Sequence, residues 1–223
     1  MPFRSGAVPG PASLDGGRGG LAGRGKRGYD RPMSAIEWIA TALGLVCVAL
    51  GARRSVWTFP TAIGSVTLFG WVVWRQRLYS DAALQLFFAA ANLYGWANWR
   101  RSRARAGEVL VTRAAAGDWW AWGAAAIVAT ALWGGAMARW TDAAYPWWDA
   151  GTAVVSMVAQ VWMARRRLEN WWLWVAVDVA LIPLYLVKHL PLFAALYAIY
   201  LALSVWGLVD WRRAVRPMGP AVA

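Results

Sequence analysis

The chain has 223 residues, of which 60% are hydrophobic and 19 are Trp, and its formal net charge is +12 at pH 7. The single Cys47 and the single His189 exclude a disulfide framework and a metal site built from several histidines. So basic a chain could bind nucleic acid, but its Lys and Arg lie almost entirely between apolar segments, so no nucleic-acid partner is expected. This many Trp residues are typical of a membrane interface or of a cavity that grips flat apolar rings.

Residues 1–32 differ in composition from the rest of the chain. They hold nine Gly, four Pro and six Lys or Arg. No apolar run follows the charges within this segment, so it is not a signal peptide, and its composition predicts a disordered tail. An alternative is that the native protein starts at Met33, directly before the first apolar segment.

After residue 33 the chain consists of apolar blocks of about twenty residues, the length that crosses the hydrocarbon of a bilayer. The blocks leave no room for a soluble domain, and residues 214–223 form a short C-terminal tail. The second and fifth blocks are diluted by Thr, Ser and Gln. The sequence predicts seven transmembrane helices, at about 34–51, 56–75, 79–100, 117–139, 146–165, 168–187 and 190–211.

The positive charges in the gaps predict the orientation of these spans. The gaps after the first, third and fifth blocks, with the C-terminal end, hold 13 Lys or Arg, whereas the other gaps hold four. Positive residues in short loops stay cytoplasmic. The C-terminus is therefore expected inside the cell and residue 33 outside it.

An internal repeat joins the third and seventh blocks. "ALQLFFAAANLYGWANWRR" at 83–101 and "ALYAIYLALSVWGLVDWRR" at 195–213 align without a gap at an offset of 112, with seven identical positions. The offset also pairs Phe59 with Trp171. The first three and last three helices are therefore expected to be two copies of one unit. The intervening helix makes the copies parallel, in a 3+1+3 plan with repeat 1 at about 34–101, a linker helix at about 117–139 and repeat 2 at about 146–213. Transporters with parallel repeats bind their substrate between the repeats near mid-membrane.

Polar and aromatic side chains fall on single faces of three predicted helices. At about 100° per residue, each of the following sets lies within roughly 60° of arc. Polar side chains deep in a span face the bundle interior, because lipid cannot satisfy them. The three stripes are Gln85, Asn92, Trp96 and Trp99; Trp171, Trp174, Asp178 and Tyr185; and Tyr197, Tyr200 and Ser204.

Asp178 is the acid that lies deepest in a predicted span. Burying a carboxylate there costs at least a few kcal/mol, so a cation, a hydrogen-bond network or a bound proton should compensate. A purely structural role remains an alternative: Asp178 would cap a polar cluster, Asn92 would bond between helices, and the Trp residues would form an interfacial belt. As a site, the stripes fit a flat, cationic solute that bears hydroxyls, held by ring stacking and cation–π attraction. A phosphorylated anion fits poorly, because no Lys or Arg is predicted inside a span.

At these residues the sequence resembles the PnuC-type vitamin transporters, whose best-known members carry nicotinamide riboside. The Q-x6-N-x-Y-G-W-x2-W and W-x2-W-x3-D strings are fairly specific, and the tail has no counterpart in the resemblance. The matching stretches are "IEWIATALGLVCVAL", "WTFPTAIGSV", "LYSDAALQLFFAAANLYGWANW" and "ENWWLWVAVDVALIPLYLVKHLPLFAALYAIYLALSVWGLVDW".

The resemblance implies a seven-helix core similar to that of SWEET sugar transporters, in a bacterial inner membrane, and it is compatible with a homo-oligomer. It implies facilitated diffusion of unphosphorylated nicotinamide riboside by alternating access, with trapping by a cytoplasmic kinase and no cofactor. Carried over by motif, the substrate contacts would be Gln85, Asn92, Tyr94, Trp96, Trp99, Trp171, Trp174 and Asp178.

Other functions remain to be weighed. Thiamine is the second candidate substrate, because it is also cationic. The acid at 178 disfavours the larger, neutral riboflavin. Proton coupling through Asp178 is a further alternative, since intramembrane acids often serve as relays. A membrane enzyme is disfavoured, because the sequence offers no metal-ligand cluster and no nucleophile with a base. A bundle without transport would leave every solute flux unchanged in Asn92→Ala and Asp178→Asn.

Overall fold

A computed structural model of the protein describes residues 35–75, 79–141 and 144–215. The expected N-terminal tail and most of the expected C-terminal tail lie outside the described residues. The described chain is helical, as the sequence predicts. Its helices are α2 (Ala35–Ala52), α3 (Thr58–Arg75), α4 (Tyr79–Ala106), α5 (Ala116–Trp140), α6 (Pro146–Ala164), α7 (Asn170–Val187) and α8 (Pro191–Ala214).

Most helix boundaries lie within a few residues of the predicted ones, but α4 is longer than expected. The sequence places the end of this span near residue 100, whereas the helix continues to Ala106. Arg and Ala are good helix formers, so the charges that end the apolar span do not end the helix. The helix ends at Gly107, which has a positive φ of 74°.

Four of the seven described helices are long and apolar enough to cross a membrane by length and composition: α2, α5, α7 and α8. The other three fall short because they carry more polar residues. Thr, Ser and Gln dilute α3 and α6, and Gln85, Asn92 and Asn98 dilute the apolar part of α4.

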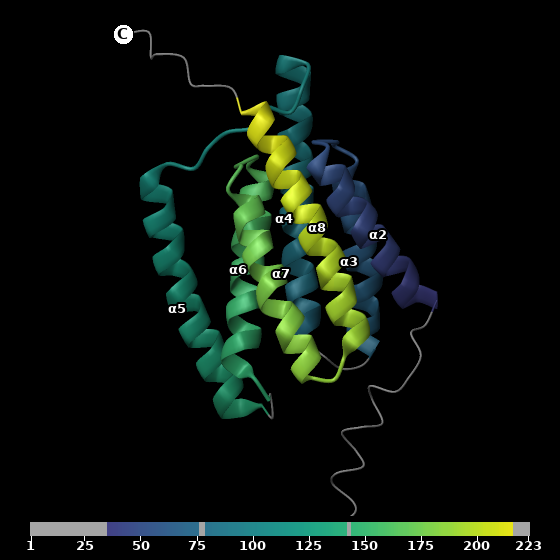
Figure 1. The fold of residues 1–223 in the computed structure, drawn as a ribbon, viewed down its shortest axis with the longest axis vertical. Helices are drawn as coiled ribbons and strands as arrows, with labels where there is room; N and C mark the ends of the chain where they lie inside the picture. The colour runs from purple at the N-terminus through teal and green to yellow at the C-terminus, as the bar shows by residue number, and fades with distance from the viewer. Residues whose placement is uncertain (1–34, 76–78, 142–143, 216–223) are drawn as a thin grey trace, which may run out of the picture. The chain divides into compact units, whose positions relative to one another are not determined.

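The helices pack in a closed ring with α5 outside it. Neighbours along the chain pack on each other from α2 to α4 and from α6 to α8, and the ring closes where α4 packs on α6 and α2 on α8. Among the described helices, α5 packs on α6 alone, at the edge of the ring (Figure 1). We call α2–α4 bundle 1 and α6–α8 bundle 2.

Two turns 112 residues apart have the same backbone hydrogen bonds. Arg54 (φ 56°) and Arg166 (φ 63°) both adopt the left-handed conformation that ends many helices. Their N–H groups donate to Gly51 O and Met163 O respectively, at 2.9 Å in each case. The turns that join α2 to α3 and α6 to α7 are therefore two copies of one structure, although their sequences differ.

Four aromatic side chains pack together between the helices near these turns. The Phe59 and Trp99 rings meet edge to face at 4.9 Å, those of Trp171 and Trp211 do so at 5.7 Å, and the Trp99 and Trp211 centroids lie 5.6 Å apart. At the offset of 112, Phe59 corresponds to Trp171 and Trp99 to Trp211. We call these four side chains the aromatic floor.

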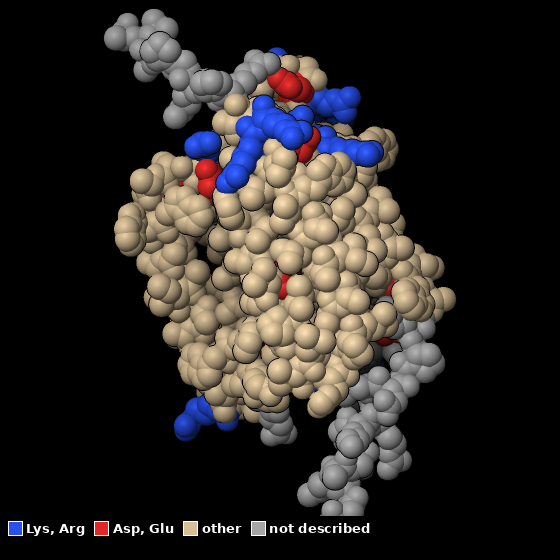
Figure 2. Space-filling model, viewed as in Figure 1, with Lys and Arg blue, Asp and Glu red and all other residues tan. Residues whose placement is uncertain are grey.

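Trp99 and Trp211 also link bundle 1 to bundle 2 by hydrogen bonds. Trp99 Nε1 donates to Met163 O and Trp211 Nε1 donates to Gly51 O, each at 3.1 Å. Donors and acceptors are again 112 residues apart, so each bundle gives one bond to the other and receives one. The aromatic floor lies toward the end of the molecule where α4 and α8 end, and most Lys and Arg of the visible face gather at that end (Figure 2).

A glycine on each side makes room for the aromatic floor. A Cβ at Gly207 would lie 2.5 Å from Trp171 Cζ2, and one at its counterpart Gly95 would collide with Phe59. Gly207→Ala is therefore expected to lower the unfolding free energy by about 1–3 kcal/mol through overpacking. Thermal unfolding of the detergent-solubilised protein measures the loss. Gly123→Ala is the control, because a Cβ there meets nothing within 4 Å; equal melting temperatures of the two variants would contradict the prediction.

Candidate substrate site

A buried carboxylate joins α7 to α8 within bundle 2. Ser204 Oγ donates to Asp178 Oδ2 at 2.9 Å, and the two residues are 2% and 3% exposed. In the described part of the chain, no Lys or Arg forms an ion pair with Asp178. A fully buried acid is rare unless it is paired, so a cationic partner from outside the chain would fit here.

A pair of amides joins α4 to α6, across the boundary between the bundles. Gln160 Nε2 donates to Asn92 Oδ1 at 3.0 Å, and Asn92 Nδ2 donates to Phe88 O at 2.8 Å. Asn92 is 4% exposed. The two bonds fix the orientation of the Asn92 amide.

Asn92 and Ser204 are 112 residues apart, so they occupy equivalent positions in the two bundles. Each lies seven residues before its floor tryptophan, which corresponds to about 10 Å along a helix. We call Asn92, Gln160, Asp178 and Ser204 the polar layer. It lies at one depth on the side of the aromatic floor that faces away from the arginine-rich end.

A row of tyrosine rings continues from the polar layer toward the opposite end. Tyr197 stacks on Tyr185 at 5.2 Å and meets Tyr200 edge to face at 5.7 Å. The Tyr200 hydroxyl reaches α2, where a Cβ added to Gly44 would lie 2.7 Å from it. The row thus runs from α7 through α8 to bundle 1.

The other predicted contacts occupy different surroundings. Trp96 and Trp174 are partly buried and pack against the core cluster that contains the aromatic floor. Trp99 and Trp171 belong to that floor and are fully buried. Rings packed in this way support the site from the protein side. Direct contact of Trp99 and Trp171 with a solute remains a prediction.

Gln85 and Tyr94 lie on opposite sides of α4. Gln85 lies against Gly70 of α3, on the helix face that also carries Asn92. Tyr94 is 52% exposed and is turned by about 200° from Asn92. The structure therefore brings Asn92 together with Trp96, and Asp178 with Ser204 and the tyrosines, whereas Tyr94 points away from them.

Gln160 is the member of the polar layer that sequence reasoning missed. It lies outside both motif strings, and in the sequence the polar residues of its block only dilute an apolar signal. A repeat comparison would have singled it out, because its counterpart at the offset of 112 is Val48. The counterpart of Asp178 is likewise apolar, Val66.

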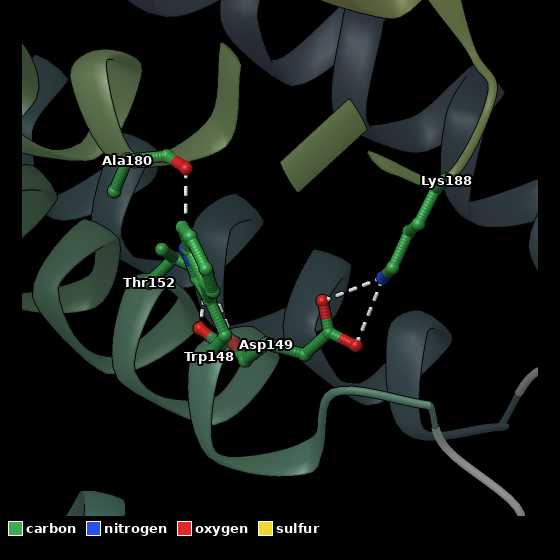
Figure 3. A network of polar contacts seen from close by, with 5 residues as sticks. All are labelled: Trp148, Asp149, Thr152, Ala180 and Lys188. Atoms are coloured by element: carbon green, nitrogen blue, oxygen red, sulfur yellow. Dashed lines mark hydrogen bonds and ion pairs between the residues drawn. The ribbon is translucent and has the colours of Figure 1, made fainter. Parts of the chain in front are cut away.

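At the end remote from the aromatic floor, polar contacts hold α6 to α7 (Figure 3). Lys188 Nζ donates to Asp149 Oδ1 at 2.8 Å and to Asp149 Oδ2 at 3.0 Å. Trp148 Nε1 donates to Ala180 O at 3.1 Å. Bundle 2 is thus bonded internally at this end as well as at the polar layer.

The chain has apolar helices with large hydrophobic side chains on their outer surfaces, and it buries Asn92, Asp178 and Ser204 between its helices. This combination defines a multi-pass membrane protein with a polar interior. The sequence model of the family described as "Nicotinamide mononucleotide transporter" matches residues 34–213, and the chain belongs to that family. It is a transporter and not an enzyme.

Curated relatives match most of the chain. The riboflavin/roseoflavin transporter RibM of Streptomyces davaonensis is 33% identical over 198 residues, which cover 85% of this chain and 92% of that protein. The nicotinamide riboside transporter PnuC of Escherichia coli is 27% identical over 226 residues, covering 87% and 91% respectively. That of Neisseria mucosa is 29% identical over 201 residues, covering 83% and 74%.

A solved structure shares the fold. The crystal structure of the vitamin B3 transporter PnuC superposes with a TM-score of 0.68 at 29% identity, over 83% of both chains. The resemblance inferred from the sequence motifs is confirmed by the family match and by this structure.

The Ser204 hydroxyl should stabilise the fold through the carboxylate it binds. Ser204→Ala is expected to lower the unfolding free energy by about 1.5–3 kcal/mol, the range for a hydrogen bond to a charged group. Ser65→Ala, which removes a hydroxyl that donates to Ala40 O at 2.8 Å, should lower it by about 1 kcal/mol. Denaturant or thermal unfolding in detergent measures both. In the Asp178→Asn background the loss from Ser204→Ala should shrink; an unchanged loss would show that the two side chains are not coupled.

Proposed function

We propose that the protein takes up nicotinamide riboside by facilitated diffusion. The observation that carries this proposal is the buried Asp178 carboxylate, which has a hydroxyl partner and no cationic partner among the described residues. A pyridinium ring would offset its charge, and the adjacent tyrosine row offers faces for stacking and cation–π attraction. Asn92 and Gln85 would bind the ribose hydroxyls or the carboxamide, and Trp96 and Trp174 would stack on the ring.

Riboflavin is the second candidate, because the relative at 33% identity is named for riboflavin and roseoflavin. Its isoalloxazine ring is neutral and larger, so it would leave the Asp178 charge unmatched. Thiamine shares the positive charge of nicotinamide riboside and fits the same argument.

The charges of the described residues disfavour a phosphorylated substrate. None of the polar-layer residues and none of the tyrosines beside them is basic, so a phosphate would meet a carboxylate without a compensating cation. The unphosphorylated vitamin would therefore be carried down its gradient and trapped in the cytoplasm by a kinase that phosphorylates it.

The same proposal sets the topology. All seven helices would cross a bacterial inner membrane, with the arginine-rich end and the C-terminus in the cytoplasm. Bundles 1 and 2 would be the two parallel three-helix repeats, and α5 the linker helix between them. The matching turns and the reciprocal tryptophan bonds support this reading, because they keep the offset of 112 in backbone and side chain alike.

Alternating access follows from where the bundles are bonded to each other. Five hydrogen-bonded or ion-paired contacts between bundle 1 and bundle 2 lie at the polar layer or toward the arginine-rich end. We propose that these contacts hold the bundles together at the cytoplasmic end. Passage inward would require these bonds to break while each bundle stays intact. Besides Asn92 with Gln160, the links are Trp99 to Met163 O, Trp211 to Gly51 O, Asn98 to Ala164 O and Arg54 with Asp210.

Substrate identity is tested by binding to purified protein. Nicotinamide riboside should raise the melting temperature or change Trp fluorescence, and nicotinamide mononucleotide should not. Asp178→Asn should weaken nicotinamide riboside by about tenfold or more, equivalent to about 1.4 kcal/mol, and leave riboflavin unaffected. Riboflavin or thiamine binding in place of nicotinamide riboside would change the vitamin and keep the fold. Loss of transport in liposomes when no proton gradient is imposed would contradict the passive mechanism.

Closure toward the cytoplasm is tested by removing the tryptophan donors. Trp99→Phe and Trp211→Phe keep a ring and remove the N–H, so each should raise the population that is open toward the cytoplasm. Spin labels at Arg103→Cys on α4 and Arg213→Cys on α8, in a Cys47→Ala background, report the distance between the bundle ends.

Trp99→Phe and Trp211→Phe should each add longer distances to the distribution between the spin labels, and the double tryptophan variant should add more. Trp57→Phe is the control, because Trp57 lies at the same end with its ring exposed. Distributions unchanged in both single variants would show that the reciprocal bonds do not hold this end closed.

A further inference from the structure

The polar layer is not symmetric, although the bundles that carry it are. Gln160 and Asp178 both belong to bundle 2, and their counterparts in bundle 1 are Val48 and Val66. The layer therefore has an amide end, where α6 meets α4, and a carboxylate end, where α7 meets α8. A solute that places its positive ring at the carboxylate end can bind in one orientation, with its polar substituents toward the amide end.

The amide end has hydrogen-bonding capacity left over. Gln160 Nε2 and Asn92 Nδ2 each carry two N–H donors, and each gives one in the bonds described. Within the described residues, Gln160 Oε1 accepts no hydrogen bond, and the side chain is only partly buried. Because Asn92 holds Gln160 Nε2, the Gln160 amide is fixed and presents an acceptor next to a donor.

We infer that Gln160 is a specificity-determining residue that reads a carboxamide on the ring of the transported vitamin. A carboxamide also presents a donor next to an acceptor, so it can pair with the Gln160 amide through two hydrogen bonds. A carboxylate presents acceptors alone, and one of them would face Gln160 Oε1. The site therefore selects the amide form of the ring over the acid form. This inference rests on the proposed function, since it assumes that a nicotinamide-type ring lies in the polar layer.

The experiment compares two ribosides that differ at this one group, nicotinamide riboside and nicotinic acid riboside. Dissociation constants are measured by calorimetry or Trp fluorescence on the purified full-length protein. The wild type should bind the amide form about tenfold or more tightly than the acid form. Gln160→Leu should reduce that ratio to about one, mainly by weakening the amide form, because the carboxamide would then lie beside an apolar side chain that cannot hydrogen-bond to it.

Two further variants separate recognition from folding. Gln160→Met keeps the length of the side chain without the amide, and its ratio should fall as in Gln160→Leu. The ratio of two affinities does not depend on the fraction of protein that is folded, so partial unfolding cannot imitate the effect. Ser156→Ala, one turn earlier on the same helix, removes a hydroxyl that donates to Thr152 O and should keep the wild-type ratio.

Each outcome has a distinct meaning. Loss of the ratio in both Gln160 variants, with the ratio kept in Ser156→Ala, supports the inference. A wild type that binds nicotinamide riboside, with an unchanged ratio in the Gln160 variants, overturns the inference and leaves the proposed function standing. A wild type that binds neither riboside overturns the proposed function, and the inference with it.

Discussion

The aromatic floor is the contact on which the rest of the structure depends. Trp99 and Trp211 are buried against each other at the centre, and each donates its indole N–H to a carbonyl at the end of the opposite bundle's first helix. A buried N–H without a partner is unfavourable, so the rings fix the distance between the bundles as well as their contact. A larger side chain at Gly95 or Gly207 would collide with Phe59 or Trp171, the rings against which Trp99 and Trp211 pack.

The polar layer follows from the position of the floor. Asn92 and Ser204 precede the floor tryptophans by the same seven residues, so placing the rings also places these side chains at one depth. The symmetry stops there, because α6 and α7 supply Gln160 and Asp178 where bundle 1 has valines. In the proposed mechanism, rocking of two similar bundles would act on an asymmetric set of polar side chains, which would bind a solute in one orientation.

The sequence predicted the helices, because apolar length and helical periodicity are patterns that a linear chain displays. The offset of 112 suggested by the sequence recurs in two turns and in the two tryptophan bonds. The sequence predicted less well how deep each side chain lies. Trp96 and Trp99 share a helix face, but only the packing of Phe59 and Trp211 shows that Trp99 belongs to the floor. Gln160 escaped notice because its role depends on Asn92, which lies 68 residues away in sequence.

Differences among vitamins should arise in the polar layer and not in the floor. The floor contacts protein, and the Trp99 and Trp211 indole N–H groups donate to backbone carbonyls, whereas Trp171 Nε1 is buried without a hydrogen-bond partner among the described residues. For each polar-layer side chain, by contrast, the solute determines whether the side chain has a hydrogen-bond or charge partner. A carboxylate would be stabilised by a pyridinium and not by a neutral ring, so the residue at 178 would change relative affinity without changing the fold of the bundles. A family whose members are named for nicotinamide riboside and for riboflavin can therefore keep one fold while a few buried positions select the solute.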